Sequence, residues 1–157
     1  MIFRIATRRD LPAVLALLAD EERVTDPASV TVGEAHERAF AAITADPRNE
    51  MLVLTDEDAD ADADAEAVLG CLQLTYVPGL GRGGRERALV EAVRIRADRR
   101  GGGLGAELMR LAVERARERG CGLVQLTSNK GRGDAHRFYE RLGFARSHEG
   151  FKLPLEP

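Results

Sequence analysis

The sequence has 157 residues, of which 44% are hydrophobic and 31% charged, the composition of an ordinary globular protein. Its apolar runs fall far short of the ~20 residues that a membrane helix needs, which excludes a membrane-spanning protein. The opening residues 1–5 lack the long apolar core of a secretory signal. We therefore expect a cytoplasmic protein that forms a single domain over residues 1–157.

The formal net charge of −3 hides an uneven distribution. Residues 56–66 hold seven acids and no base, whereas the rest of the chain has 23 basic and 19 acidic residues. Alternating Asp and Ala offer no apolar face, so this acidic loop is predicted to be a mobile hairpin tip. It lacks the glycine and closing glutamate of a calcium-binding EF-hand loop, so no metal is expected. The mildly basic remainder suits an anionic cofactor and is too weak for nucleic-acid binding.

Strands and helices alternate through the first half of the chain. Residues 3–6 are predicted to form a strand, and apolar residues at helical spacing predict a helix over about 11–22, capped by Asp10. A second helix is predicted over about 32–44, with its inner side formed by Ala35, Ala39, Phe40 and Ile43. Strands are predicted over residues 51–54 and 68–75, on either side of the acidic loop. The Arg/Gly-rich residues 78–87 are predicted to form an exposed hairpin loop or, alternatively, a basic rim for an acidic substrate or the cofactor.

The best-defined predicted element is a helix over about residues 104–119, with one apolar stripe: Leu104, Leu108, Leu111, Ala112 and Ala116. It follows an apolar strand over residues 88–95 and a glycine-rich turn. Beyond it we expect a strand over 122–127, a helix over 134–142, and two short strands around 144–147 and 151–153. Because helices are interleaved with strands, the predicted fold class is α/β with a mixed central sheet.

The two cysteines, Cys71 and Cys121, lie far apart, each in a strand-like context and without a histidine nearby in sequence. A disulfide framework or a metal site needs more ligands than this. Two reduced thiols are therefore expected.

The turn between this strand and this helix holds four glycines within five positions, residues 101–105. The N–H groups of a first helical turn have no partner inside the helix, and glycine lets a ligand approach them closely. This pattern predicts a pyrophosphate site at the helix N-terminus. No lysine lies near the turn, which excludes a P-loop. Gly101, Gly103 and Ala106 match the dinucleotide fingerprint, but the next strand lacks the acid that would hold a ribose hydroxyl.

A third pattern, Arg/Gln-x-x-Gly-x-Gly/Ala, is matched by Arg100-Gly101-Gly102-Gly103-Leu104-Gly105. A later block agrees, Ala135-His136-Arg137-Phe138-Tyr139-Glu140-Arg141-Leu142-Gly143-Phe144. In this order the two blocks resemble the acyl-CoA-binding motif and late helix of the GNAT family of N-acetyltransferases. The resemblance is close over residues 89–153 and covers the N-terminal half only in its order of elements. It implies a GNAT fold, whose mixed, mostly antiparallel sheet is splayed in the middle and flanked by about four helices.

The resemblance also implies acetyl-CoA as the co-substrate. Backbone N–H groups of the turn would hold its pyrophosphate, and the main chain of the preceding strand would pair with its pantetheine arm. Asn129 is a further candidate contact, whereas Arg132 stands where the family often has asparagine. The predicted cofactor-binding residues are Val93, Ile95, Arg100, Gly101, Gly102, Gly103, Leu104, Gly105, Ala106 and Asn129.

Acetyl transfer to an amine needs a neutral amine, donors to the oxyanion and a proton for the leaving thiolate. By its position in the late block, Tyr139 resembles the acid that protonates the CoA sulfur; alternatively, its ring only packs beside the cofactor. Glu91, a carboxylate in an apolar strand, is the candidate general base, acting directly or through a water; alternatively, it forms a salt bridge with a neighbouring arginine such as Arg94.

We therefore expect an acetyl-CoA-dependent N-acetyltransferase that acts on the primary amine of a small molecule by direct attack. The alternatives are a non-catalytic acyl-CoA-binding or regulatory module, and acetylation of a protein amine. Some family members with a similar Asp-Ala-His-Arg-Phe-Tyr helix acetylate aminoalkylphosphonates, anions that the arginines of residues 78–87 would tolerate. No nucleic-acid or membrane partner is expected, and family members are often homodimers.

Overall fold

The computed structural model describes residues 1–21, 30–56 and 68–155. Its strands are β1 (Ile2–Ile5), β2 (Asn49–Thr55), β3 (Val68–Val77), β4 (Arg87–Ile95) and β5 (Leu123–Leu126). Its helices are α1 (Leu11–Glu21), α2 (Glu34–Ala45), α3 (Leu104–Glu118) and α4 (Gly133–Arg141), with short 3-10 helices η1 (Arg8–Asp10), η4 (Arg82–Gly84) and η5 (Ala97–Arg99). The chain divides into two compact units, Met1–Gln125 and Leu126–Pro157, which are described separately.

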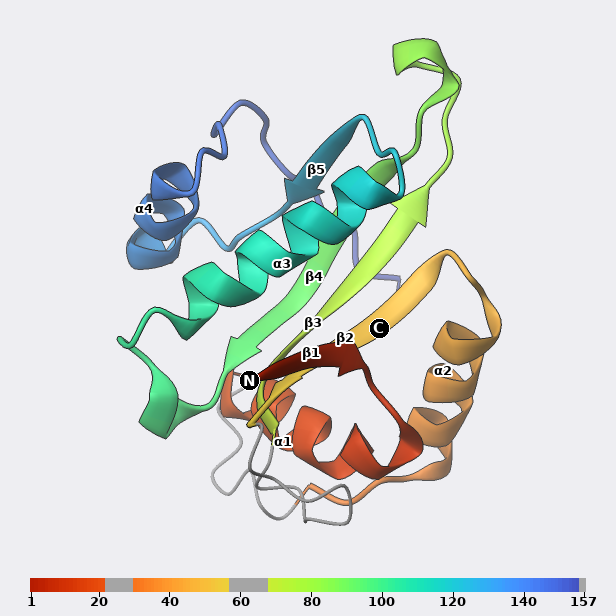
Figure 1. The fold of residues 1–157 in the computed structure, drawn as a ribbon, viewed down its shortest axis with the longest axis vertical. Coiled ribbons are helices and arrows are strands. Elements are labelled where there is room, and N and C mark those ends of the chain that lie inside the picture. Colours follow the sequence, from red (N-terminus) through yellow and green to blue (C-terminus); the bar gives the residue numbers. More distant parts are fainter. Residues whose placement is uncertain (22–29, 57–67, 156–157) are drawn as a thin grey trace. The chain divides into compact units, whose positions relative to one another are not determined.

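The five strands form one sheet in the order β1-β2-β3-β4-β5. The first four strands pair antiparallel with their neighbours. Figure 1 shows β5 running in the same direction as β4, and helix α3 supplies the crossover that a parallel pair requires. The sheet is therefore mixed and mostly antiparallel, which confirms the predicted fold class.

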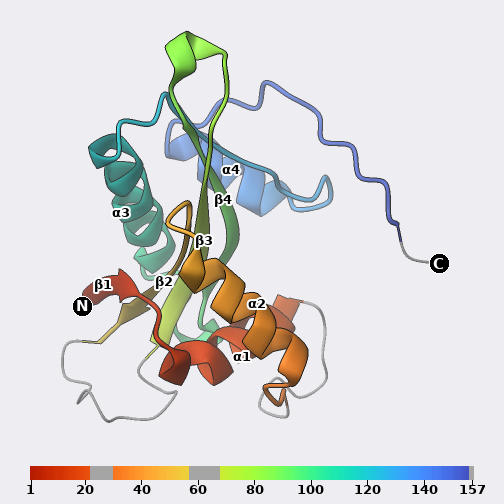
Figure 2. The same cartoon turned by 90° about the vertical axis from the view of Figure 1, so that its right-hand side faces the viewer.

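Helices cover both faces of the sheet in the first unit. Figures 1 and 2 show α3 on one face and α1 with α2 on the other. Under α1 and α2, the buried core cluster comprises Ala6, Ala13, Val14, Leu17, Met51, Val53, Val68 and Cys71. On the opposite face, α3 buries residues at helical spacing: Leu104, Leu108, Met109, Ala112 and Ala116. The stripe predicted for this helix is thus confirmed, with Leu111 only partly buried.

The structure differs from three local predictions. Residues 144–155 contain no strand, so the two strands predicted around 144–147 and 151–153 are wrong. Asp10 is not the N-cap of α1; it ends η1 and accepts hydrogen bonds from the backbone N–H and the hydroxyl of Thr7, at 2.7 and 3.1 Å. In α2, Phe40 and Ile43 pack against the core as expected, but Ala35 and Ala39 are exposed.

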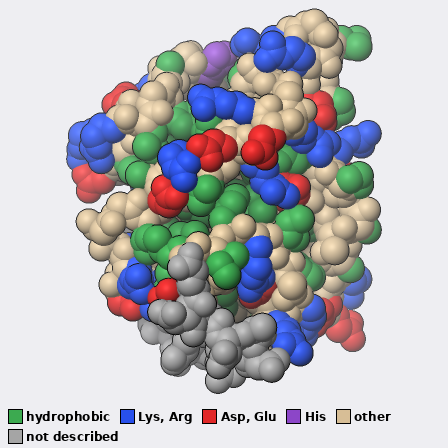
Figure 3. All heavy atoms as spheres, viewed as in Figure 1, with side chains coloured by type: hydrophobic (Ala, Val, Ile, Leu, Met, Phe, Trp, Pro, Cys, Tyr) green, Lys and Arg blue, Asp and Glu red, His purple; other side chains and the backbone are tan. Residues whose placement is uncertain are grey.

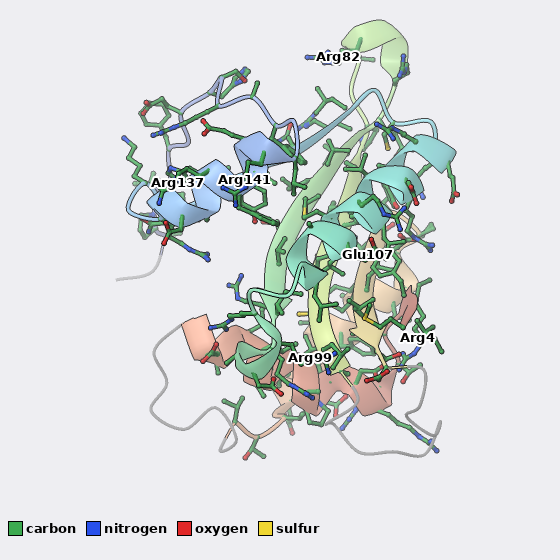
Figure 4. All side chains as sticks on the ribbon, turned by 60° about the vertical axis from the view of Figure 1, so that its left-hand side comes forward. Arg4, Arg82, Arg99, Glu107, Arg137 and Arg141 are labelled. Carbon is green, nitrogen blue, oxygen red and sulfur yellow. The ribbon has the colours of Figure 1, made fainter. Side chains whose placement is uncertain are left out.

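The loop that joins β3 to β4 is an exposed hairpin, as predicted for residues 78–87. Leu80 is fully exposed in it, and Figure 4 shows Arg82 at its tip. The predicted acidic loop lies, apart from Asp56, outside the described residues. Within the described ranges, no helix is both long and apolar enough to cross a bilayer.

Candidate active site

Strand β4 contains a β-bulge just before its last residues. In the register of β3 and β4, Ala92 and Val93 share the position opposite Leu72. Ala92 has a φ of 54°, which residues other than glycine rarely adopt. The Cys71 thiol lies 3.7 Å from the Ala92 carbonyl, to which it donates. Because a bulge interrupts the ladder and bends the strand, it redirects the backbone of the residues that follow.

Strand β5 covers only the first part of β4. The Gly122 N–H donates to the Glu86 carbonyl at 2.7 Å, which sets the start of β5 beside the start of β4. Strand β5 has four residues against nine in β4, and four residues span about 13 Å. The later part of β4, to which Val93 and Ile95 belong, therefore extends past the end of β5. Figure 1 shows β4 running on beyond β5. The last residues of β4 thus lie beyond the stretch that β5 accompanies.

The glycine turn follows this uncovered end of β4. Gly101 and Gly103 have φ values of 79° and 85°, and Gly103 is the N-cap of α3. Both are exposed, and a Cβ atom at either would have no neighbouring atom within 4 Å. The positive φ angles, rather than lack of space, explain why glycine is needed at these two positions.

The first turn of α3 offers backbone donors. Within the described chain, Glu107 is the first residue of α3 whose N–H has a backbone partner, the Gly103 carbonyl at 3.1 Å. The N–H groups of Leu104, Gly105 and Ala106 precede it, at the positive end of the helix dipole. This arrangement fits the pyrophosphate of CoA, because it supplies several donors and a partial positive charge without any particular side chain.

The arginines around the turn are each paired with an acid. Arg96 contacts Asp98 at 2.7 Å, and Arg99 lies 4.0 Å from Asp56. Arg100 forms an ion pair with Asp20 of α1. Figure 4 shows Arg99 in the segment between β4 and α3. The local positive charge of the side chains is thus largely balanced, which leaves the backbone as the main attraction for an anion.

Acidic and basic side chains also balance one another along α3. Arg110 donates to Glu107 at 2.6 Å and forms a second ion pair with Glu114. The hydrogen bonds from Arg110 hold the pKa of Glu107 below its usual value. Figure 3 shows red and blue side chains side by side over this face. The one carboxylate in the first turn of α3 is therefore neutralised by its own helix.

The candidate base Glu91 lies on β4 next to the bulge. It faces Gln73 of β3 in the register and is exposed. Val93 and Ile95, the predicted pantetheine contacts, are partly buried further along the same strand. The first unit thus brings together Glu91, the uncovered strand end and the glycine turn.

The second unit contains Tyr139 and Asn129. Tyr139 lies on α4, with its ring packed edge-on against Phe138 and Phe144 at centroid distances of 5.1 and 6.0 Å. Asn129 shapes the loop before α4, because its side-chain oxygen accepts the Gly131 N–H at 2.9 Å. Its carbonyl also lies 2.8 Å from Nε2 of His136. The Asn129 side-chain oxygen is therefore engaged within its own loop.

Neither cysteine is set up as a nucleophile. Both are free thiols, as predicted. Burial raises the pKa of Cys71 to about 12 and also raises the pKa of Cys121. A thiol needs to be ionised to attack a thioester, so the raised pKa values make both cysteines poor nucleophiles.

Comparison with known proteins identifies the family to which this chain belongs. The model of the acetyltransferase (GNAT) family matches residues 13–144, most of the chain. The chain belongs to the GNAT acetyltransferase family. A structure described as a transcriptional regulator from Bacillus halodurans C-125 is 40% identical, with a TM-score of 0.85 over 98% of this chain and 99% of that chain. An acetyltransferase of Trypanosoma brucei is 25% identical, with a TM-score of 0.77 over 98% and 99% of the two chains.

A curated relative matches a shorter stretch of this GNAT chain. Over 56 residues it is 46% identical to an aminoalkylphosphonate N-acetyltransferase of Salmonella typhimurium. The alignment spans 36% of this chain and 36% of that relative.

Three residues close to the candidate site in the structure were not singled out in the sequence. Ala92 gives no sign of its positive φ, since alanine has no preference for that conformation. Asp20 lies 80 positions before its partner Arg100, and no local pattern links them. Gly70 did carry a signal, because a glycine inside a strand often marks close approach of another backbone.

Proposed function

We propose that this GNAT chain is an acetyl-CoA-dependent N-acetyltransferase that transfers an acetyl group to the primary amine of a small molecule by direct attack. The observation that carries the proposal is the turn between β4 and α3. There, two glycines at positive φ lead into a helix whose first N–H groups lack backbone partners in the described chain. Family membership supports the same co-substrate.

In this proposal the backbone of residues 101–106 binds the pyrophosphate, and the main chain of Val93 and Ile95 pairs with the pantetheine arm. The bulge at Ala92 and Val93 favours such pairing, because it bends β4 where this segment begins. Acetyl-CoA would supply the acetyl group as an activated thioester. Asn129 is a further candidate contact through its side-chain NH2 group, since its side-chain oxygen is already engaged by Gly131.

Tyr139 is the proposed acid for the leaving thiolate. Its position within the family-like block of α4 supports this role, and its ring is held by two phenylalanines. Glu91 is the proposed general base that takes a proton from the amine, through a water. Its exposed place on β4 beside the uncovered strand end supports this role.

The proposed acceptor is a small amine, and an aminoalkylphosphonate is the first to try because the curated relative acts on that class. The alternative is a non-catalytic acyl-CoA-binding or regulatory module. One observation keeps that alternative in view: the 40% identical structure carries the description of a transcriptional regulator.

Two measurements on the purified chain test the proposal. Thermal unfolding with acetyl-CoA reports cofactor binding, since a ligand that binds only the folded state raises the unfolding temperature. A free-thiol assay over a panel of amines, with aminoalkylphosphonates and a lysine peptide included, reports transfer. We expect both stabilisation and thiol release with a small amine. Stabilisation without thiol release from any amine would favour the module, and no stabilisation by any acyl-CoA would contradict both functions.

A further inference from the structure

The side chain of Arg100 folds back from the glycine turn toward the end of β4 and the last turn of α1. Its Nε donates to the Ile95 carbonyl at 3.0 Å. Its Nη2 donates to a carboxylate oxygen of Asp20. Ile95 is the last residue of β4, and Asp20 lies in the last turn of α1. One guanidinium group therefore ties the entry of the turn to a strand and to a helix.

This direction is informative, because an arginine beside a phosphate site is usually expected to contact the phosphate. Here the guanidinium donates to the Ile95 carbonyl and the Asp20 carboxylate, both groups of the protein. The donors that remain for a phosphate are the N–H groups of Leu104, Gly105 and Ala106, whose position depends on how the turn is held. An ion pair as exposed as this one adds little to folding stability. Its effect is therefore expected in ligand binding.

We propose that Asp20 is a positioning residue of the pyrophosphate-binding turn and that it acts through Arg100. The carboxylate fixes the guanidinium against the Ile95 carbonyl, and this holds the entry of the turn beside the end of β4. The first N–H groups of α3 then point to one place before the ligand arrives, which reduces the cost of ordering the turn on binding. This inference rests on the proposed binding of acetyl-CoA.

Direct contact between Arg100 and the phosphate would predict the opposite change in CoA affinity. If Arg100 bound the phosphate directly, Asp20 would compete with the ligand for the guanidinium. Removing the Asp20 charge would then release Arg100 and tighten the binding of CoA. In the positioning role, the same change loosens the turn and weakens binding. The direction of the change in the dissociation constant therefore separates the two roles.

The experiment is a calorimetric titration of CoA into four proteins: wild type, Asp20→Asn, Asp20→Glu and Asp98→Asn. Asp98→Asn is the matched control, because it removes the same charge two residues from Arg100 but its partner is Arg96. We expect Asp20→Asn to weaken CoA binding by about two- to fivefold, in the range of a single exposed ion pair. Asp20→Glu should recover part of the loss, and Asp98→Asn should bind no more weakly than wild type.

Thermal unfolding of the ligand-free proteins completes the test. We expect Asp20→Asn and wild type to unfold at nearly the same temperature, so that the change is specific to binding. Equal or tighter CoA binding by Asp20→Asn would overturn the positioning role, as would an equal weakening in Asp98→Asn. A large loss of ligand-free stability in Asp20→Asn would also overturn it, in favour of a purely structural contact. A wild-type chain that fails to bind CoA would instead contradict the proposed function itself.

Discussion

Gly70 of β3 lies opposite Ile95 of β4, and a Cβ atom at Gly70 would come within 2.7 Å of Cδ1 of Ile95. It would also come within 2.8 Å of the Arg94 carbonyl, which is backbone and has little freedom to move. The absence of a side chain at Gly70 thus lets the end of β4 approach β3 closely. That strand end leads directly into the glycine turn.

Gly70→Ala is expected to push the end of β4 away from β3. We expect an overpacking cost of about 1–3 kcal/mol in the free energy of unfolding, measured by chemical denaturation. Binding of CoA, measured by titration, should weaken as well, because Ile95 and the turn move with the strand. The control is Gly81→Ala in the exposed hairpin, where a Cβ has no neighbour within 4 Å. Unchanged CoA affinity in a folded Gly70→Ala protein would contradict the link between Gly70 and the site.

Two glycines at opposite ends of α3 allow backbone strain to be separated from ligand binding. Gly103 and Gly120 both have a φ of 85°, and a Cβ at either has no neighbour within 4 Å. Alanine at each position should therefore cost a similar amount, about 1–2 kcal/mol of unfolding free energy. Only Gly103→Ala should weaken CoA binding, because only Gly103 precedes the proposed phosphate donors. Similar CoA affinities in the two variants would argue against a phosphate site at the turn.

The two tyrosines provide a matched pair for testing the proposed acid. Tyr139→Phe keeps the ring contacts with Phe138 and Phe144 but removes the proton donor. We expect kcat to fall by about a hundredfold or more, with little change in KM for acetyl-CoA. Tyr76→Phe removes a hydroxyl that donates to Glu50 at 2.9 Å, so it should lower stability by about 1 kcal/mol and leave turnover unchanged. An unchanged kcat in Tyr139→Phe would remove the acid role.

The sequence correctly predicted those features that depend on residues near one another in the chain, and it failed where a feature depends on a distant segment. The stripe on α3 depends on spacing within one helix, so Leu104, Leu108 and Ala112 were correctly placed in the core. A strand, by contrast, exists only if a neighbouring strand pairs with it. The apolar residues around Phe151 and Leu153 show a strand-like spacing, yet they are exposed and form no strand. The spacing alone contained no information about a partner.

The same distinction holds for the candidate site. The glycines of the turn were found because positive φ angles and close backbone approach select that residue type directly. The bulge at Ala92 arises from the registers of two strands, and the pair of Asp20 with Arg100 joins segments far apart in the chain. Such features follow from tertiary structure and leave no trace in local composition.

A partly buried ion pair near the far end of α3 predicts how stability depends on pH. Arg115 donates to both carboxylate oxygens of Glu50, at 2.6 and 2.9 Å, and Tyr76 donates to one of them. Burial by itself would raise the pKa of Glu50, but these hydrogen bonds outweigh burial and lower the pKa. The ionised form of Glu50 is therefore favoured in the folded state.

Because the folded-state pKa of Glu50 lies below its unfolded value of about 4.3, its contribution is fully present above that pH. It is lost as the pH falls through the folded-state pKa. We expect Glu50→Gln to cost about 1.5–3 kcal/mol of unfolding free energy at pH 7, and the difference from wild type to shrink between about pH 5 and pH 3. Denaturant titrations over this range measure the difference.

Glu114→Gln, which removes an exposed acid of α3, is the control and should give a small difference in unfolding free energy at every pH. A Glu50→Gln difference that stays constant from pH 7 to pH 3 would mean that the charge of Glu50 does not stabilise the fold.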